Sequence, residues 1–270
     1  MTESSQPKQF SYEYASIFQD QSVVDAYRHR PIYPAAVFDI LLDLIPAYCA
    51  PRTVLDAGCG TGFIARKLAP LVDRLDAVDF SPAAIATGKQ LAGGDHPHLR
   101  WLAGPMESVP IDPPYCLITA GASLHWMDWR VVMPRFARAL TPGGVLALIG
   151  INTLLPPWFD ETRPLFARYS MNRDFQPYNE ETILATMAEW GLFRRLGKRV
   201  TETLDMHQPI AEWIESFHAR NGFSRDRMDP AHVAAFDDGL RRAAEKNHPD
   251  GTIPLRYSGQ VIWGEPLIGG

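Results

Sequence analysis

Short apolar runs alternate with helix-like stretches through the first half of the chain. The runs are rich in Val, Leu, Ile and Ala, as buried strands are, and they lie at residues 52–57, 74–80, 98–104, 115–121 and 145–151. Apolar residues at helical spacing predict helices between them, at residues 63–69, 82–91 and 129–140. Strands that alternate with helices in this way predict a parallel sheet with helices on both faces.

The regular alternation stops after residue 151, where the chain becomes rich in aromatic residues. Asn179 is a candidate cap for a helix that ends at Gly191. Pro209 and Pro230 each begin a further predicted helix. Two more strand-like runs are predicted, at residues 199–206 and 253–263.

These patterns predict a single α/β domain over residues 1–270, with a doubly wound, mostly parallel sheet of seven strands. A helical cap is expected as an insertion after strand five. The predicted parts are N-terminal lid helices at 1–50, a ligand-binding core at 51–151, a cap at 152–198 and 207–250, and closing strands at 199–206 and 253–263.

Composition narrows the classes of partner. The 270 residues are 46% hydrophobic and 21% charged, and the net charge of -5 argues against a nucleic-acid-binding surface. Cys49, Cys59 and Cys116 lack metal-ligand spacing, so we expect reduced thiols and no metal. The first ten residues lack the apolar core of a signal peptide, and no apolar run could span a bilayer. We expect a cytoplasmic protein with a small-molecule substrate and no membrane partner; the oligomeric state stays open.

The stretch VLDAGCGTG, at residues 54–62, is the strongest candidate for a ligand-binding turn. Gly60-x-Gly62-x-x-Ala65 satisfies the dinucleotide-binding pattern G-x-G-x-x-G/A, and Asp79 follows Gly62 at the distance of a ribose-binding acid. Asp56 argues against that interpretation. A carboxylate facing a pyrophosphate would cost about 3 kcal/mol at an effective dielectric of ~20 and a separation of ~5 Å.

S-adenosylmethionine reverses the sign of this interaction, because it carries an ammonium and a sulfonium and no phosphate. Open α/β sheets bind ligands at the carboxyl ends of their strands. Asp56, Asp79, residues 104–107 and residues 120–121 all lie at such predicted ends, so they are expected to converge on one site. The alternative without a ligand is a tight strand-to-helix turn.

VLDAGCGTG, together with DAVDFSP, GPMESVP and LTPGGVLAL, resembles the class I S-adenosylmethionine-dependent methyltransferases, in particular small-molecule members of the type 11 and trans-aconitate methyltransferase groups. The resemblance covers about residues 30–151 and implies a Rossmann-like fold. It implies that the methionine and ribose are lined by Asp56, Gly58, Gly60 and Gly62. It also assigns the ribose hydroxyls to Asp79, the adenine to Phe80 and the Met106 amide, and the cofactor's amino group to the Ala120 carbonyl.

Two parts of the resemblance leave alternatives. Pro105 stands where the family commonly has an acid that accepts from the adenine amino group, so either Glu107 substitutes for that acid or the contact is lost. RPIYP at residues 30–34 resembles an entry segment of small-molecule members, in which Arg30 would pair with the cofactor's carboxylate. Arg30 is equally well explained as a surface arginine, and Tyr27 as a packing residue.

The methyl acceptor is predicted from SLHWMDW at residues 123–129. The pair His125-Trp126 resembles a pair in trans-aconitate, malonyl-carrier-protein and juvenile hormone acid methyltransferases, which methylate carboxylates. O-methylation of a carboxylate is therefore favoured over that of a hydroxyl, with His125 either a base or a residue that orients the loop. The candidate substrate residues are Tyr27, Trp126, Trp158, Tyr178, His218 and Arg220.

Three alternatives to O-methylation remain at this point. The acceptor atom could be carbon or nitrogen. A nicotinamide-dependent oxidoreductase would need a first turn that tolerates phosphate. A non-catalytic protein could bind S-adenosylmethionine through the same loop.

Overall fold

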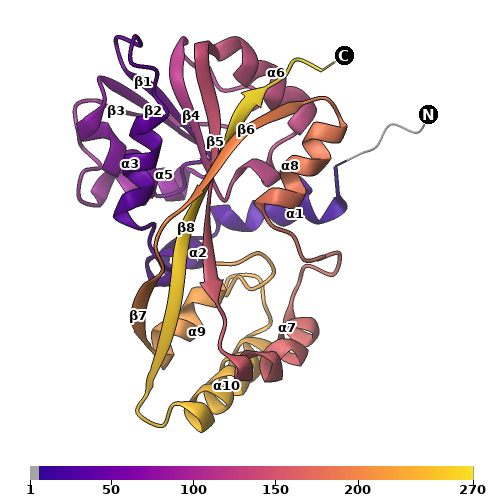
Figure 1. Ribbon diagram of the computed structural model, residues 1–270. Helices are drawn as coiled ribbons and strands as arrows, with labels where there is room; N and C mark the ends of the chain where they lie inside the picture. The colour runs from indigo at the N-terminus through magenta and orange to yellow at the C-terminus, as the bar shows by residue number, and fades with distance from the viewer. Residues whose placement is uncertain (1–5, 270) are drawn as a thin grey trace.

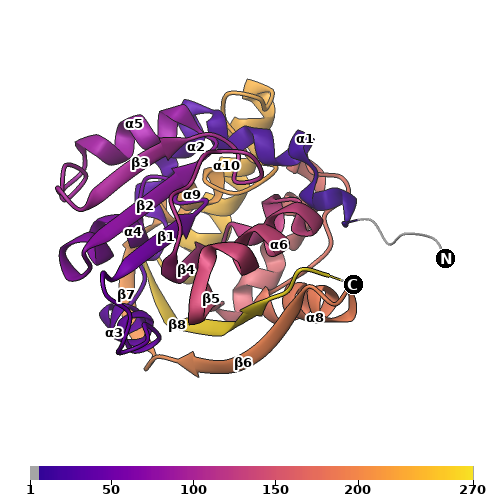
Figure 2. The same cartoon turned by 90° about the horizontal axis from the view of Figure 1, so that it is seen from above.

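One sheet of eight strands forms the centre of the computed structural model, which describes residues 6–269. Residues 1–5 and 270, at the two ends of the predicted domain 1–270, lie outside the described residues. The strands are β1 Thr53–Ala57, β2 Arg74–Asp79, β3 Leu99–Ala103, β4 Tyr115–Gly121, β5 Leu140–Leu154, β6 Phe193–Val200, β7 Leu204–Pro209 and β8 Thr252–Pro266. Their order is β3-β2-β1-β4-β5-β8-β6, and β7 also pairs with β8 (Figure 2).

The strands from β3 to β5 are parallel, and β8 is antiparallel to its three neighbours β5, β6 and β7. The α/β, mostly parallel, Rossmann-like fold is thus confirmed. The sheet has eight strands because the predicted strand 199–206 is in fact split between β6 and β7. β6 reads FRRLGKRV and is largely exposed at the edge of the sheet, so it lacks the apolar pattern that marked the other strands.

Ten α-helices are present in the described part of the chain. They are α1 Tyr12–Ala15, α2 Gln21–Ala26, α3 Ala35–Asp43, α4 Phe63–Leu68, α5 Pro82–Gln90, α6 Trp129–Ala139, α7 Arg163–Tyr169, α8 Glu180–Glu189, α9 Ile210–His218 and α10 Pro230–Asn247. The predicted cap of α8 is confirmed: Asn179 forms a capping box with Thr182. At the start of α5, Ser81 accepts from the Ala84 amide.

Helices cover both faces of the sheet (Figures 1 and 2). On one face, α3 and α4 pack on a cluster that includes Leu41, Leu68 and Leu117. On the other face, α6 and α8 pack on a second cluster that includes Phe136 and Met187. The predicted cap range 152–198 therefore contains one helix, α8, that belongs to the core, because its apolar face is buried against the sheet.

The cap is built on the two longest strands. β5 and β8 each have 15 residues and continue beyond the rest of the sheet into the cap, as Figure 1 shows. There α7, α9, α10 and the 3-10 helix η6 Pro157–Thr162 surround a third hydrophobic cluster. Its buried aromatic members are Phe159, Tyr169, Trp213, Phe217, Phe223 and Phe236. Most aromatic side chains of the insert thus form a core of their own.

The N-terminal segment lies between the core and the cap (Figure 1). α2 contacts α5 of the core and α9 of the cap. Polar contacts hold the segment to the cap: Arg227 pairs with Asp20, and the Asn221 side chain donates to the Tyr14 carbonyl at 2.6 Å. This segment therefore covers the carboxyl ends of the strands, where the sequence predicts the ligand site.

The expectation of three reduced cysteines is wrong for two of them. Cys49 and Cys116 form a disulfide, with Cα atoms 6.2 Å apart, and Cys59 is the free cysteine of the described chain. The loop between α3 and β1 brings Cys49 beside the start of β4, within the distance that a disulfide spans. Sequence spacing carries no sign of this contact, since the two residues are 67 positions apart.

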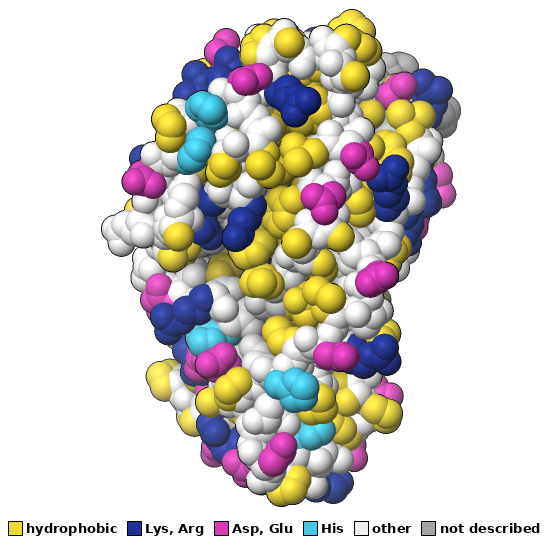
Figure 3. All heavy atoms as spheres, turned by 60° about the vertical axis from the view of Figure 1, so that its left-hand side comes forward, with side chains coloured by type: hydrophobic (Ala, Val, Ile, Leu, Met, Phe, Trp, Pro, Cys, Tyr) yellow, Lys and Arg dark blue, Asp and Glu magenta, His cyan; other side chains and the backbone are white. Residues whose placement is uncertain are grey.

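The surface shows no large region of one charge on the face turned forward in Figure 3, where hydrophobic side chains gather along the middle and acidic and basic side chains are interspersed around them. Within the described residues, no helix is both long and apolar enough to cross a membrane.

Candidate functional site

The glycine loop joins β1 to α4 and leaves one position open. Gly58, Gly60 and Gly62 all have positive φ, at 70°, 56° and 75°, a conformation that favours glycine. A Cβ on Gly58 would collide with Ser123, and a Cβ on Gly62 would collide with Trp101, whereas a Cβ on Gly60 would meet nothing within 4 Å. The backbone at Gly60 thus borders free space.

Asp79, at the end of β2, holds this loop in place. Its Oδ2 accepts from the Gly60 amide at 2.7 Å, and its Oδ1 accepts from the Ser81 amide at 2.8 Å. Burial raises the pKa of Asp79 above its usual value. A carboxylate oxygen can accept more than one hydrogen bond, so both oxygens keep capacity for a ligand.

Asp56 lies beneath the loop, with only 1% of its surface exposed. Its Oδ1 accepts from the Thr119 hydroxyl at 2.8 Å, while its Oδ2 is buried without a hydrogen-bond partner of good geometry. Burial raises the pKa of Asp56 to about 7, although the Thr119 hydroxyl and the Ala65 amide act in the opposite direction. The structure thus places this charge behind the loop, where it acts on a ligand through its field.

The residues predicted to face an adenine lie at the ends of β2 and β3. Phe80 is half-buried and has the Tyr12 ring 6.3 Å away. Met106 is buried in the core cluster. The Glu107 carboxylate accepts from the Asp128 amide at 2.8 Å, ahead of α6. Glu107 therefore already has a structural partner, and its substitution for the missing family acid is not supported by this contact.

The turn after β4 carries backbone strain that the sequence did not reveal. Ala122 has φ 51°, which no other described non-glycine residue shares in sign. The Ser123 hydroxyl donates to the Ala57 carbonyl at 2.6 Å and so fixes the turn against β1. Ala120, predicted to contact the cofactor, is buried directly before this turn. A strained backbone conformation of this kind persists only where surrounding contacts maintain it, and such conformations are common at functional sites.

His125 follows that turn and is almost fully buried. Its Nε2 shares a hydrogen bond of 3.0 Å with the Tyr178 hydroxyl. Burial, and then the charge of Arg30, lower the pKa of His125 to about 3, and burial raises the pKa of Tyr178 to about 12. Both groups are therefore neutral around pH 7. Trp126 packs against Phe18, with ring centroids 5.2 Å apart.

Two arginines lie near the pair formed by His125 and Tyr178. The Arg30 guanidinium lies 5.7 Å from the Tyr27 ring, and the Arg220 guanidinium lies 4.5 Å from the Phe217 ring. Burial and the charge of Arg30 lower the pKa of Arg220 to about 10. Arg220 is nevertheless exposed to solvent. In the described structure, neither guanidinium has an ion-pair partner.

One acid of this site, Glu180, was not predicted from the sequence. The Glu180 carboxylate lies against Gly150 of β5, where any Cβ would collide with it, and it accepts from the Gln260 amide at 2.7 Å. Glu180 also lines a small cavity with His125 and Ala122. The capping pattern placed Glu180 at a helix start, but its position over Gly150 depends on the pairing of β5 with β8.

Two predicted substrate residues lie elsewhere, inside the cap. His218 is fully buried; its Nδ1 lies 2.7 Å from the Phe223 carbonyl, and its Nε2 lies 2.8 Å from Asp237. The Trp158 indole donates to His248 at 3.0 Å. Both side chains are thus engaged with the cap itself, and this placement argues against substrate contact for either of them.

Comparisons with known proteins agree with the arrangement at the glycine loop. Residues 54–144 match a family model described as a methyltransferase domain. An uncharacterized methyltransferase of Mycobacterium bovis is 37% identical over 131 residues, which are 47% of this chain and 50% of that protein. A malonyl-[acyl-carrier protein] O-methyltransferase of Dechloromonas aromatica is 35% identical over 124 residues, 44% of this chain and 42% of that protein. The chain spans about half the length of these curated relatives, or less.

Solved structures agree on the fold. A putative type II methyltransferase from Anaeromyxobacter dehalogenans has a TM-score of 0.63 at 23% identity, over 89% of this chain and 99% of that one. The YcgJ protein of Bacillus subtilis has a TM-score of 0.54 at 16% identity, over 87% of this chain and 100% of that one. At these identities the likeness concerns the fold alone.

Proposed function

We propose that this protein, whose residues 54–144 match a methyltransferase-domain model, is a class I S-adenosylmethionine-dependent enzyme that transfers a methyl group to a small anionic molecule. The favoured reaction is O-methylation of a carboxylate. The observation that carries the proposal is that two arginines without an acidic partner among residues 6–269 lie near the carboxyl end of the sheet: Arg30 acts on the neutral His125, and Arg220 acts on Tyr178, which is hydrogen-bonded to that histidine.

The residues at the loop fit S-adenosylmethionine. Free space borders Gly60, and the Asp79 carboxylate beside it has capacity for the ribose hydroxyls. The buried charge of Asp56 attracts a sulfonium and an ammonium but repels a pyrophosphate. Arg30 is available to bind the cofactor's carboxylate, since no acid of the described chain pairs with it.

Binding and alignment are the protein's main contribution to the proposed reaction. When bound, S-adenosylmethionine supplies a methyl group that its sulfonium already activates. Holding an acceptor in line with that carbon contributes about 7–11 kcal/mol in well-oriented systems. We assign the acceptor's anionic group to Arg220, and the exclusion of water to the aromatic contact of Trp126 with Phe18 in the N-terminal segment.

The neutral His125 supports a carboxylate acceptor. A group whose pKa is about 3 removes protons poorly at pH 7, so His125 suits an acceptor that needs no base. A carboxylate is already ionised at that pH. We therefore assign His125 the role of orienting the turn after β4 through its hydrogen bond with Tyr178.

Glu180 favours a second candidate, N-methylation of an amine. Its carboxylate lines the small cavity beside His125, and a negative charge there attracts an ammonium. Such an acceptor would have to lose a proton before reaction, and the Glu180 carboxylate is the candidate that takes it. The two candidates differ in which of Glu180 and Arg220 contacts the reacting group.

Ligand binding tests the cofactor assignment first. We expect S-adenosylhomocysteine to raise the melting temperature, and NAD⁺ and NADP⁺ to leave it unchanged. Stabilisation by a dinucleotide alone would contradict the methyltransferase proposal and favour an oxidoreductase. Binding of S-adenosylhomocysteine without methyl transfer to any acceptor would indicate a non-catalytic binding protein.

The nature of the product tests the acceptor atom. A panel of small carboxylic acids, phenols and amines is incubated with S-adenosylmethionine that carries a labelled methyl group. Methyl esters release the label as methanol in alkali, whereas N-methyl and C-methyl products retain it. We expect alkali-labile product, with a rate that changes little in His125→Asn. Alkali-stable product, together with a large loss of rate in Glu180→Gln, would favour the amine.

Arg220→Met tests anion recognition. We expect the KM for a carboxylate acceptor to rise roughly tenfold to a hundredfold, because hydrogen bonds to a charged group contribute about 1.5–3 kcal/mol. Arg168→Met is the matched control, since Arg168 also lies over an aromatic ring of the cap, at 5.2 Å from Tyr169. Equal effects of both variants would assign Arg220 a role in cap stability.

A further inference from the structure

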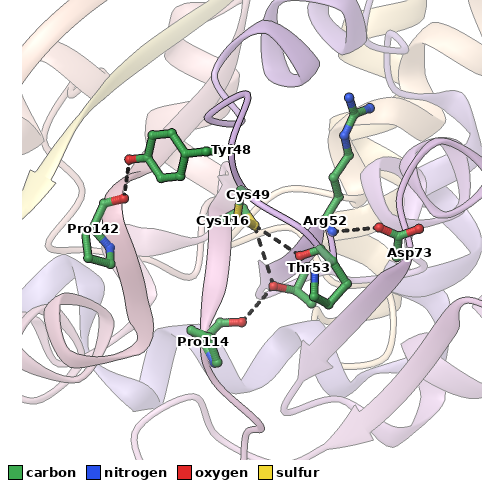
Figure 4. The surroundings of a disulfide bond; sticks show 9 residues. Tyr48, Cys49, Arg52, Thr53, Asp73, Pro114, Cys116 and Pro142 are labelled. Carbon is green, nitrogen blue, oxygen red and sulfur yellow. Dashed lines mark hydrogen bonds between the residues drawn. A yellow bond between two sulfur atoms is a disulfide. The ribbon is translucent and has the colours of Figure 1, made fainter.

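The disulfide lies at the end of the sheet opposite the glycine loop. Cys116 is the second residue of β4, and Cys49 lies on the loop that leads into β1. Both cysteines line a cavity of about 210 Å³, whose other walls include Tyr48, Pro51, Thr53, Arg74, Pro114 and Thr141. Figure 4 shows the bond among several of these side chains. The bond can therefore be approached from a space that admits a small molecule.

The two sulfur atoms are unequally accessible. Cys116 has 1% of its surface exposed and belongs to the core cluster beneath α3 and α4. Cys49 is half-buried and packs at the margin of that cluster. Both residues border the cavity, but a nucleophile that enters it can reach Cys49 more readily, because Cys49 is the more exposed of the two. Access to a sulfur atom determines which one is attacked in thiol–disulfide exchange.

The surroundings of Cys116 also accommodate its reduced form. Its Sγ lies 3.5 Å from the Pro51 carbonyl oxygen, to which a thiol can donate, and 3.8 Å from the Thr53 hydroxyl. Arg74 lines the same cavity, where its guanidinium pairs with the Asp112 carboxylate at 2.6 Å. Cys116, once it has left and taken a proton, can therefore be accommodated as a thiol that donates to the Pro51 carbonyl.

We propose that Cys49 is a site of reversible exchange with small-molecule thiols, with Cys116 as the leaving group. The incoming thiolate attacks Cys49 Sγ, the Cys49–Cys116 bond breaks, and its electron pair remains on Cys116, which takes a proton from solvent. The product is a mixed disulfide at Cys49 that occupies the cavity. Attack of a second thiolate on this mixed disulfide releases a small-molecule disulfide and leaves Cys49 reduced.

The exchange is independent of the proposed methyl transfer, because it uses the amino ends of β1 and β4. The cofactor loop and the turn after β4 lie at the carboxyl ends of the same strands. Exchange at Cys49 therefore leaves S-adenosylhomocysteine binding in place. A protein that fails to bind S-adenosylhomocysteine would still exchange at Cys49, so the two proposals fail separately.

Glutathione is the probe for the test, applied to the folded full-length chain without denaturant. With excess reduced glutathione, we expect the count of alkylatable thiols to rise from one, Cys59, to three. Early in the reaction, peptide mapping by mass spectrometry should find the glutathione adduct on Cys49. A disulfide that opens only in denaturant, or an early adduct on Cys116, would overturn the proposal.

Two matched variants separate the roles of the cysteines. With oxidised glutathione, Cys116→Ser should form one mixed disulfide at Cys49, whereas Cys49→Ser should leave Cys116 unmodified in the folded protein. Mapping distinguishes either adduct from one on Cys59. Modification of Cys116 in Cys49→Ser to the same extent contradicts the assigned asymmetry. If a variant does not fold, the wild-type time course alone decides which sulfur is attacked.

Discussion

The two ends of the central sheet differ in how their buried carboxylates are paired. At the amino end, Asp76 of β2 is fully buried, but Arg100 binds it through two hydrogen bonds of 2.8 and 2.7 Å, and the Tyr115 hydroxyl donates to it at 2.5 Å. At the carboxyl end, Asp56 and Asp79 are also buried, yet no cation pairs with either in the described structure. Within the described residues, the sheet therefore carries a buried carboxylate paired with a cation at one end, and buried carboxylates without a cation at the other.

This difference separates stability from ligand binding. The Asp76 carboxylate, with a guanidinium and a hydroxyl as partners, links β2 to β3 and β4. A buried carboxylate without a cation has a raised pKa, as Asp56 and Asp79 show. At the carboxyl end the fold tolerates the free-energy cost of burying a carboxylate without a cation, and a cationic ligand can reduce that cost. Arg30 and Arg220 form the complementary case for an anion.

Asp76→Ala is expected to have the largest effect. It leaves the Tyr115 hydroxyl and the Arg100 guanidinium without their shared acceptor, so the free energy of unfolding should fall by roughly 3 kcal/mol. Urea denaturation measures this loss. S-adenosylhomocysteine affinity should not change, because Asp76 lies at the opposite end of β2. Asp112→Asn is the control, since Asp112 is an exposed member of the same network. A loss of affinity in Asp76→Ala would contradict the proposal that the amino end of the sheet contributes to stability and the carboxyl end to ligand binding.

Asp79→Ala is the corresponding change at the carboxyl end. We expect S-adenosylhomocysteine affinity to fall by about 1.5–3 kcal/mol, because charge-assisted hydrogen bonds to the ribose are lost. Isothermal titration calorimetry measures the change. Ser81→Ala is the matched control: it removes the cap of α5 at the same loop but leaves the Asp79 carboxylate in place. An equal loss of affinity in both variants would show that loop geometry, rather than the carboxylate, is what binding requires.

Only part of this difference between the two ends of the sheet could be predicted from the sequence. The five parallel strands were predicted within a few residues at most boundaries, because each is a local apolar run, and Asp56 and Asp79 follow from their place at strand ends. The partners of Asp76 were not predicted, since Arg100 and Tyr115 come from two other strands. Pairings that depend on tertiary contact leave no local pattern, and the Cys49–Cys116 bond is a further example.

On the acceptor side of the site, too, contacts that depend on the tertiary structure could not be predicted from the sequence. Residue type makes Trp158 and His218 candidates for substrate contact, yet the cap uses both for its own packing and hydrogen bonds. Nothing local marks Glu180 as a site residue, because a helix-start pattern does not show which strand the helix packs on. Arg220 was selected as a cation that could serve an acceptor, but its approach to Arg30 depends on how the cap sits on the N-terminal segment.

The smallest expected effect on ligand affinity concerns pH. Because the pKa of Asp56 is raised to about 7, the ligand-free protein holds an extra proton between about pH 4 and pH 7 relative to the unfolded chain. Its stability should therefore fall as the pH rises through that window and level off above it. Affinity for S-adenosylmethionine should change in the opposite direction, rising roughly three- to tenfold from pH 6 to pH 8 as Asp56 ionises and attracts the sulfonium. S-adenosylhomocysteine, which lacks that charge, should respond less. Calorimetry with both ligands, on the wild type and on Asp56→Asn, measures these slopes. A slope that persists in Asp56→Asn would assign the titration to another group and leave the contrast between the paired and unpaired acids without its main support.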